Sequence, residues 1–180
     1  MFESTHYEVR QKFGITTKYR VYEDDEPILE SKKKKLRLKE DFRFTDADTG
    51  TERFRVKADS VLDIAAAYDI VDSETGERVG SVKRSAVSFL KHEYELLGPD
   101  GQTVAYIRED SVLKAVIRRN VTTFLPFEYN IESPAGESFG SIHESFSFRD
   151  KYQIDLADTT SVDPRLVVVG AVVIDAIEEN

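Results

Sequence analysis

The stretch that decides the fold is the C-terminal segment DLADTTSVDPRLVVVGAVVIDAIEEN, residues 155–180. Its centre holds nine consecutive apolar or glycine residues, Leu166 to Ile174. Asp163 followed by Pro164 is a typical helix N-cap and first-turn pair, from which a helix can continue through Ile177. The many valines, however, favour a buried strand. A length of about fourteen residues favours the helix, but local preference alone leaves both structures open.

A helix over residues 164–177 is apolar on every side, so protein or lipid must surround it. At ~1.5 Å per residue its length is roughly 21 Å, which is short of the ~30 Å that a membrane-spanning helix covers. Asp175 and the following glutamates shorten the apolar part further. We therefore expect a helix buried inside protein, and its structural residues are Asp163, Pro164, Leu166, Val169, Gly170, Val173, Ile174 and Asp175.

One pattern recurs in front of this segment. An aromatic residue starts a short alternating strand, a turn rich in Asp or Gly follows, and a second alternating strand returns. Such a pattern predicts a β-hairpin. The copies start at Tyr19, Phe42, Tyr68, Tyr94 and Tyr129, with a half-copy at Tyr152, and turn glycines lie at Gly50, Gly76, Gly101 and Gly136.

With residues 6–13 before the first copy, the pattern predicts about twelve short strands, which is typical of a closed barrel or a sandwich. Joined to the buried segment, it predicts a mainly β fold. We expect a closed antiparallel barrel of about twelve strands, residues 5–157, enclosing a hydrophobic C-terminal α-helix at residues 164–177. The length of 180 residues suits one domain over residues 1–180.

The composition narrows the classes of function. The chain has 34 acidic and 25 basic residues, a net charge of −9 and no cysteine. Without cysteine it has no disulfide, no Cys-ligated metal and no thiol nucleophile, and this fits a reducing interior. The N-terminus lacks the pattern of a secretory signal, so we expect a cytoplasmic protein. The acidic balance argues against nucleic-acid binding.

The densest basic run, Lys32 to Lys39, contrasts with this acidic balance. On a strand, Lys33, Lys35, Arg37 and Lys39 share one face and two leucines point the other way. The run is then either a solvated face that guards against edge-to-edge aggregation or an anion site for phosphorylated headgroups. Candidate neighbours for such a site are Lys83, Arg84 and Lys91, or the pair Arg118 and Arg119.

No pattern for catalysis or a cofactor stands out. His6, His92 and His143 lie far apart and outside metal-ligand spacings, and the glycine and serine motifs of common enzymes are missing. The turn DADTG at residues 46–50 resembles the start of a calcium loop, but Gly50 and Lys57 occupy positions where an EF-hand needs other residues. We expect a hairpin turn there, no catalytic residue, no metal and no cofactor; an enzyme with a site on the barrel rim stays open.

The chain as a whole resembles the LURP-one-related family, whose fold is shared with the tubby C-terminal domain and the phospholipid scramblases. The resemblance lies in the opening QKFGITTKYRVYEDDEPILE, in the order of the hairpins and in the ending, where Gly170-Ala171 leads to Ile174-Asp175. It implies a closed twelve-stranded barrel around a buried C-terminal helix, and so favours the helix where propensity left two choices.

The resemblance also implies functions. Tubby-like domains bind phosphoinositides and scramblases act on membrane phospholipids, although no headgroup motif matches this chain residue by residue. We expect a non-enzymatic binding or scaffold module whose partner is an acidic phospholipid headgroup or a protein. The alternative is a scramblase-like lipid-handling protein. The scramblase likeness also suggests calcium at Asp155, Asp158 and Asp163, but the family's longer calcium segment is not reproduced, and capping and turn roles explain two of these residues.

Overall fold

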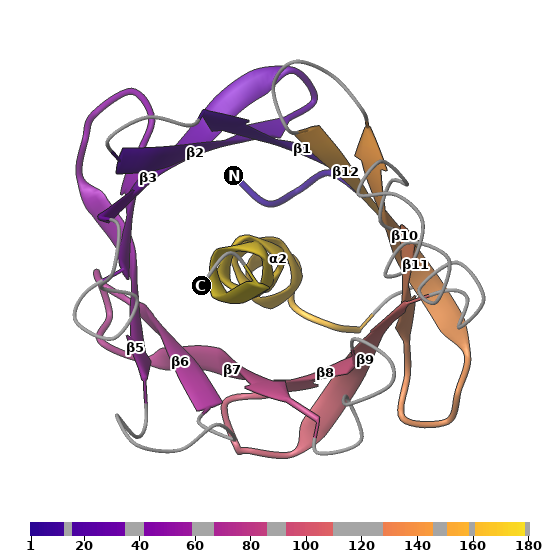
Figure 1. Cartoon of the computed structure of the whole chain (residues 1–180). Helices are drawn as coiled ribbons and strands as arrows, with labels where there is room; N and C mark the ends of the chain where they lie inside the picture. Colours follow the sequence, from indigo (N-terminus) through magenta and orange to yellow (C-terminus); the bar gives the residue numbers. More distant parts are fainter. Residues whose placement is uncertain are drawn as a thin grey trace.

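The chain forms a closed β-barrel with a helix inside it, as seen in a computed structural model (Figure 1). The structure describes residues 1–12, 16–34, 42–58, 67–85, 93–109, 128–145, 151–158 and 161–178. In these residues the elements are β1 (His6–Lys12), β2 (Thr16–Glu23), β3 (Glu26–Lys34), β4 (Phe42–Asp46), β5 (Glu52–Ala58), β6 (Ala67–Asp72), β7 (Arg78–Arg84), β8 (Glu93–Leu97), β9 (Thr103–Glu109), β10 (Glu128–Glu132), β11 (Ser138–Ser145), β12 (Lys151–Leu156) and α2 (Pro164–Glu178).

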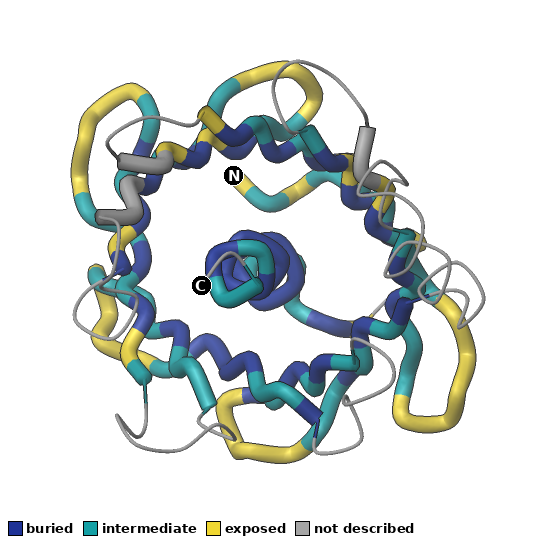
Figure 2. Tube along the Cα trace, in the orientation of Figure 1, coloured by how far each residue is buried: buried dark blue, intermediate teal, exposed yellow. Residues whose placement is uncertain are grey.

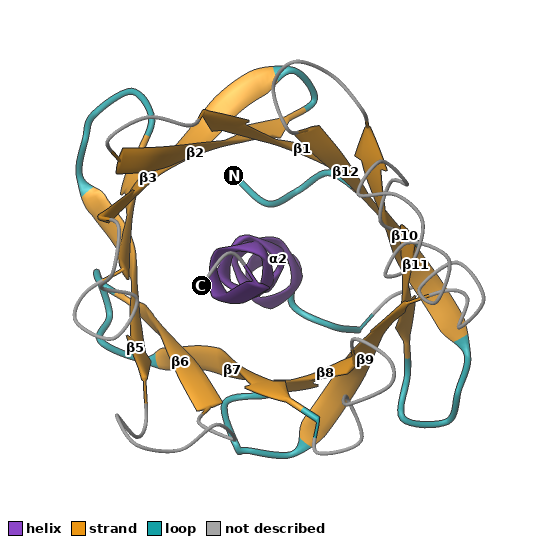
Figure 3. Ribbon diagram, viewed as in Figure 1, coloured by secondary structure: helices purple, strands orange, loops and turns teal. Residues whose placement is uncertain are grey.

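Every strand pairs antiparallel with its neighbours in the chain, and β1 closes the ring on β12 (Figure 3). The closing register runs from His6 opposite Asp155 to Arg10 opposite Lys151. Closure removes the unpaired edges that an open sheet presents to other chains. The predicted fold class, a twelve-stranded antiparallel barrel that encloses its C-terminal helix, is confirmed.

The predicted hairpin turns lie together at one end of the barrel, which we call the turn end. Gly50, Gly76, Gly101 and Gly136 have φ between 69° and 86° there, a region that glycine enters without steric cost. In the turn at residues 46–50, Asp46 Oδ1 accepts hydrogen bonds from the backbone N–H of Asp48 (3.1 Å) and Thr49 (2.9 Å). The DADTG segment is therefore a hairpin turn, as its composition predicts.

The core lies between the barrel wall and α2 (Figure 2). Alternate strand residues such as Tyr7, Phe44 and Ile107 are fully buried, and Leu166 to Ile174 are buried without a break. Because this apolar run is uninterrupted, the helix is stable only where protein surrounds it on all sides.

The helix does not pack equally against all strands. It packs most closely against β6, β7 and β8. Two glycines permit this approach: a Cβ on Gly80 would lie 2.4 Å from the Leu97 carbonyl oxygen and 2.8 Å from Leu166 Cδ1, and a Cβ on Gly170 would lie 3.1 Å from Val82 Cγ2. The helix is consequently displaced toward one side of the barrel.

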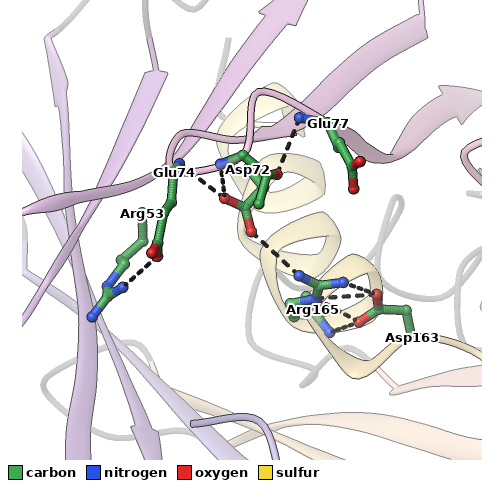
Figure 4. A network of polar contacts seen from close by, with 7 residues as sticks. Arg53, Asp72, Glu74, Glu77, Asp163 and Arg165 are labelled. Atoms are coloured by element: carbon green, nitrogen blue, oxygen red, sulfur yellow. Dashed lines mark hydrogen bonds and ion pairs between the residues drawn. The ribbon is translucent and has the colours of Figure 1, made fainter.

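Polar contacts hold the two ends of α2. At the turn end, Asp163 caps the helix by accepting the N–H of Arg165 (2.9 Å), and the Arg165 guanidinium bridges Asp163 and Asp72 (2.7 and 3.3 Å; Figure 4). At the opposite end, which we call the far end, Glu178 accepts a hydrogen bond from the Tyr94 hydroxyl and lies 3.8 Å from Arg84. The helix is thereby fixed along the barrel axis.

Candidate functional site

A basic hollow lies on the outer face of β1, β2 and β3, toward the far end of the barrel. Its volume is about 290 Å³. Side chains that alternate with the buried core residues supply its charge: Arg10, Lys12, Lys18 and Arg20 line it, together with Tyr22 and Glu30. We call this hollow, with the six side chains just named, the basic hollow.

The register of the sheet places like charges directly opposite one another in the basic hollow. Arg10 is opposite Arg20, and Lys12 is opposite Lys18. On the next strand, the backbone of Lys32 is opposite Lys18. Such pairs destabilise a sheet, because facing side chains lie within about 5.5 Å of each other at Cβ.

Carboxylates offset the arginine pair. Glu8 accepts a hydrogen bond from Arg10 and lies 3.4 Å from Lys151, and Glu30 accepts one from Arg20. Partial burial by itself would raise the pKa of Glu8, but the bond and charge of Arg10 lower it on balance. The Arg10 guanidinium also lies 3.9 Å from the centre of the Tyr22 ring, so a cation–π contact helps to hold it in place.

The described residues provide no such compensation for the lysine pair. Lys12 and Lys18 are exposed, and neither forms an ion pair with any residue in the part of the chain that the structure describes. A comparison makes the difference clear: Arg43 and Arg55 also face each other, but both bind Glu52 (2.9 and 2.8 Å). Within the described residues, the basic hollow therefore combines two held guanidinium groups with two ammonium groups that have no ion-pair partner, which is the donor set that phosphate groups bind.

The structure describes only some of the basic residues that the sequence predicts for an anion site. Lys33 is the last residue but one of β3, and its backbone lies opposite Thr17. Lys35, Arg37 and Lys39 fall outside the described residues, as do Lys91, Arg118 and Arg119. The other candidate neighbours, Lys83 and Arg84, lie on β7, and β4, β5 and β6 separate them from β3.

Sequence reasoning missed the four cations of the basic hollow. A signal was present, because basic residues alternate with buried ones in both strands, as in Arg10-Gln11-Lys12 and Lys18-Tyr19-Arg20. Each pair of charges is unremarkable on its own strand. Only the pairing of β1 with β2 brings the two pairs face to face.

The suggested calcium ligands do not converge. Asp155 pairs with His6 (2.6 Å), Asp163 caps α2, and Asp158 is exposed in the link between β12 and α2. Among the described residues, no three acidic or histidine side chains come together in a way that would hold a metal ion. In the same residues, no helix has the length and apolar character required to cross a membrane.

Comparison with known proteins identifies the family. A model of the LURP-one-related family matches residues 28–175. The chain belongs to the LURP-one-related family. A solved structure with the same fold, the X-ray structure of a protein from Arabidopsis thaliana, aligns with 96% of this chain and 91% of that chain at a TM-score of 0.58. At a sequence identity of 8%, this likeness shows only that the two proteins share a fold. No curated protein matches the chain.

The LURP-one-related match does not include the whole basic hollow. The matched residues begin at position 28 in β3, so they contain Glu30 but neither pair of facing cations on β1 and β2. The family match therefore covers the chain from within β3 to within α2. It carries no information on what binds to Arg10, Lys12, Lys18 and Arg20, and the function of this surface must be argued from its geometry.

Proposed function

We propose that this LURP-one-related protein is a non-enzymatic binding module whose basic hollow binds the headgroup of an acidic phospholipid at a membrane surface. The observation that carries the proposal is the facing pair Lys12 and Lys18, which lie beside Arg10 and Arg20 in a hollow of about 290 Å³. A bound phosphate would relieve the repulsion between these cations, so the same feature that costs stability in the free protein supports binding.

The proposed binding is peripheral and electrostatic. Each Lys or Arg near an anionic leaflet contributes about 1 kcal/mol. Because Glu8 and Glu30 offset the two arginines, the attachment depends mainly on the two lysines, and it is modest and weakened by salt. The net charge of −9 opposes approach in most orientations. Because the basic hollow lies on one face, this opposition also orients the barrel with β1, β2 and β3 toward the lipid. An anionic cytoplasmic leaflet is the membrane surface that such a module would meet, which supports a cytoplasmic location.

Vesicle co-sedimentation tests the proposal. The protein is mixed with phosphatidylcholine vesicles with and without phosphatidylserine, at low and at high salt. We expect binding only to the anionic vesicles, and release by salt. In the double variant Lys12→Glu/Lys18→Glu, the partition coefficient should fall by roughly thirtyfold or more, since the two lysines together contribute about 2 kcal/mol.

A matched control separates local charge from total charge. The single variant Lys57→Glu, on β5, changes the net charge as much as the single variant Lys12→Glu does, and it should retain most of the binding. An equal loss in both single variants, or equal binding to neutral vesicles, would refute the role of the basic hollow. Reversal of Lys35, Arg37 and Lys39 in the same assay tests the basic run predicted from the sequence, which together with Lys33 remains a candidate extension of the binding surface.

A further inference from the structure

The residues in front of β1 form a short strap at the turn end of the barrel. In the view along the barrel, the chain runs from β1 into the ring of strands, and the N-terminus lies inside that ring (Figure 1). We call Phe2, Glu3 and Ser4 the strap. Thr5 forms its base, because the Thr5 carbonyl oxygen accepts the N–H of Leu156 (2.8 Å). The strap belongs neither to the barrel wall nor to α2.

The ring of Phe2 completes the aromatic half of the core. Buried aromatic side chains line the inner face of β1 to β5, namely Tyr7, Tyr19, Phe42, Phe44 and Phe54. Because α2 packs most closely against β6 to β8, these large side chains lie where the helix is farther from the wall. The ring centroid of Phe2 lies 6.0 Å from that of Tyr7 and 5.8 Å from that of Phe54, which it meets edge to face. The barrel thus provides a place for one more aromatic ring, and the strap fills it.

One carboxylate holds the backbone of the strap. The N–H groups of Phe2, Glu3 and Ser4 all donate to Glu23, beside the β2–β3 turn, at 2.9, 2.5 and 2.9 Å. Partial burial by itself would raise the pKa of Glu23, but these three hydrogen bonds lower it on balance. Glu23 is therefore ionised at neutral pH, and hydrogen bonds to a charged acceptor are roughly twice as strong as neutral ones.

The remaining polar contacts of the strap lie near its base. Ser4 accepts a hydrogen bond from the Tyr7 hydroxyl at its carbonyl oxygen (2.6 Å), and its own hydroxyl donates to Asp24 (2.9 Å). Within the described residues, Phe2 is held by Glu23 and by the contacts of its ring. Release of Glu23 would therefore free the tip of the strap while its base stays attached.

The position of Phe2 also favours release. Its φ of 65° lies in the left-handed region, which bulky residues rarely adopt. Its side chain is only partly buried, whereas that of Phe44 is fully enclosed. Strained backbone and partial burial both lower the free energy that is required to open a segment locally.

We propose that the strap is a lid over an internal site for a small neutral aromatic ligand. When the tip of the strap swings out from Thr5, the ring of the ligand takes the place of Phe2 between Tyr7 and Phe54. The place of one benzyl group limits the ligand to a single ring with a short substituent. This site is independent of the basic hollow, which lies on the outer face of β1, β2 and β3 and binds an anion.

A titration with toluene, followed by NMR of the aromatic side chains, tests this proposal. We expect saturable shifts of the ring resonances of Tyr7 and Phe54, whereas those of Tyr94, on β8, should not respond. Cyclohexane has a similar size but no π system. It should bind roughly two- to tenfold more weakly, because aromatic pairs contribute more than their buried area alone. The absence of saturable shifts in the parent protein, or equal affinity for cyclohexane, would overturn the proposal.

Variants test the lid separately from the site. Phe2→Ala removes the competing ring, and its affinity for toluene should exceed that of the parent by roughly tenfold or more, because the apparent affinity follows the fraction of molecules with an open site. Glu23→Gln keeps the shape of the side chain but loses the charge, so it should open the lid and raise the affinity roughly three- to tenfold.

The matched control is Glu137→Gln, an exposed residue of the β10–β11 turn at the same end of the barrel. It should bind toluene as the parent does. Unchanged affinity in the folded Glu23→Gln protein would show that Glu23 does not hold a lid, and a folded Phe2→Ala protein that binds no toluene would show that the site does not exist.

Discussion

Asp46 illustrates how a single carboxylate determines local structure in this barrel. Hydrogen bonds from the backbone N–H of Thr49 and from Arg53 lower its pKa from 3.8 to about 2. Arg53 Nη2 lies 3.0 Å from Asp46 Oδ2, and the same guanidinium reaches Glu74 (3.3 Å; Figure 4). Asp46, which the sequence predicts as a turn residue, is thus also linked through Arg53 to the β6–β7 turn.

This pKa predicts a dependence of stability on pH. A carboxyl group whose pKa is lower in the folded state contributes stability that is complete above its unfolded pKa and is lost as the pH falls through the folded pKa. For Asp46 the loss should occur as the pH falls from 3.8 toward about 2. Asp46→Asn should therefore lose less stability than the parent over this range, as measured by urea unfolding at a series of pH values.

The control for this experiment is Asp48→Asn, because Asp48 is an exposed carboxylate of the same turn. It should leave the difference between high and low pH as in the parent. If Asp46→Asn shows the same pH dependence as the parent protein, the hydrogen bonds to Asp46 do not contribute the stability assigned to them.

The contact between α2 and β7 illustrates packing between elements. Gly80 and Gly170 come from opposite sides of this contact but differ in what surrounds them. A Cβ on Gly80 would meet the backbone oxygen of Leu97, which cannot move independently of β8, whereas a Cβ on Gly170 would meet the methyl groups of Val82 and Leu96. The side chains of Val82 and Leu96 can adjust more readily than the backbone of β8, which is paired on both sides.

This difference predicts unequal effects of the same substitution. Gly80→Ala should destabilise the protein by about 1–3 kcal/mol, the usual range for overpacking a core. Gly170→Ala should be close to neutral, because alanine gains up to about 1 kcal/mol of helix propensity over glycine, which offsets the tighter contact. Chemical denaturation of both variants checks the prediction, and a Gly80→Ala protein as stable as the parent would show that β7 has room for a Cβ at this position.

Only part of the secondary structure of these elements could be predicted from the residues themselves. The alternation of Tyr94 and Leu96, or of Tyr129 and Ile131, predicts strands correctly because period-two burial is local. The segment from Leu166 to Ile174 was ambiguous, because its valines suit a strand and its length suits a helix. The family resemblance, rather than propensity, favoured the helix that the structure contains.

At the scale of the whole molecule, α2 is the core around which the barrel closes. Seven large aliphatic side chains of the helix are buried, namely Leu166, Val167, Val168, Val169, Val172, Val173 and Ile174. At about 1.5–3 kcal/mol each, their burial is worth on the order of 10–20 kcal/mol. This is comparable to the net stability of about 5–15 kcal/mol of a whole domain.

Removal of α2 should consequently abolish the fold. We expect a chain truncated after Val162 to be aggregated, or to lack a cooperative thermal transition by circular dichroism and calorimetry. A chain that ends at Glu178 keeps the helix and should melt as the parent does. A soluble truncated protein with a cooperative transition near that of the parent would contradict the central role of the helix.

The sequence by itself determined the strands, the turns and the need to bury the C-terminal segment, because each depends on residues that are close together in the chain. Alternating apolar residues define strands, Asp and Gly define turns, and an apolar run without a polar face cannot lie on a surface. Only the tertiary structure decided which charges meet. Lys12 faces Lys18 through the register of two strands, and the close approach of α2 to β7 depends on Gly80 and Gly170, which lie far apart in the sequence. Register and asymmetric packing depend on distances between residues far apart in the sequence, which no local pattern encodes.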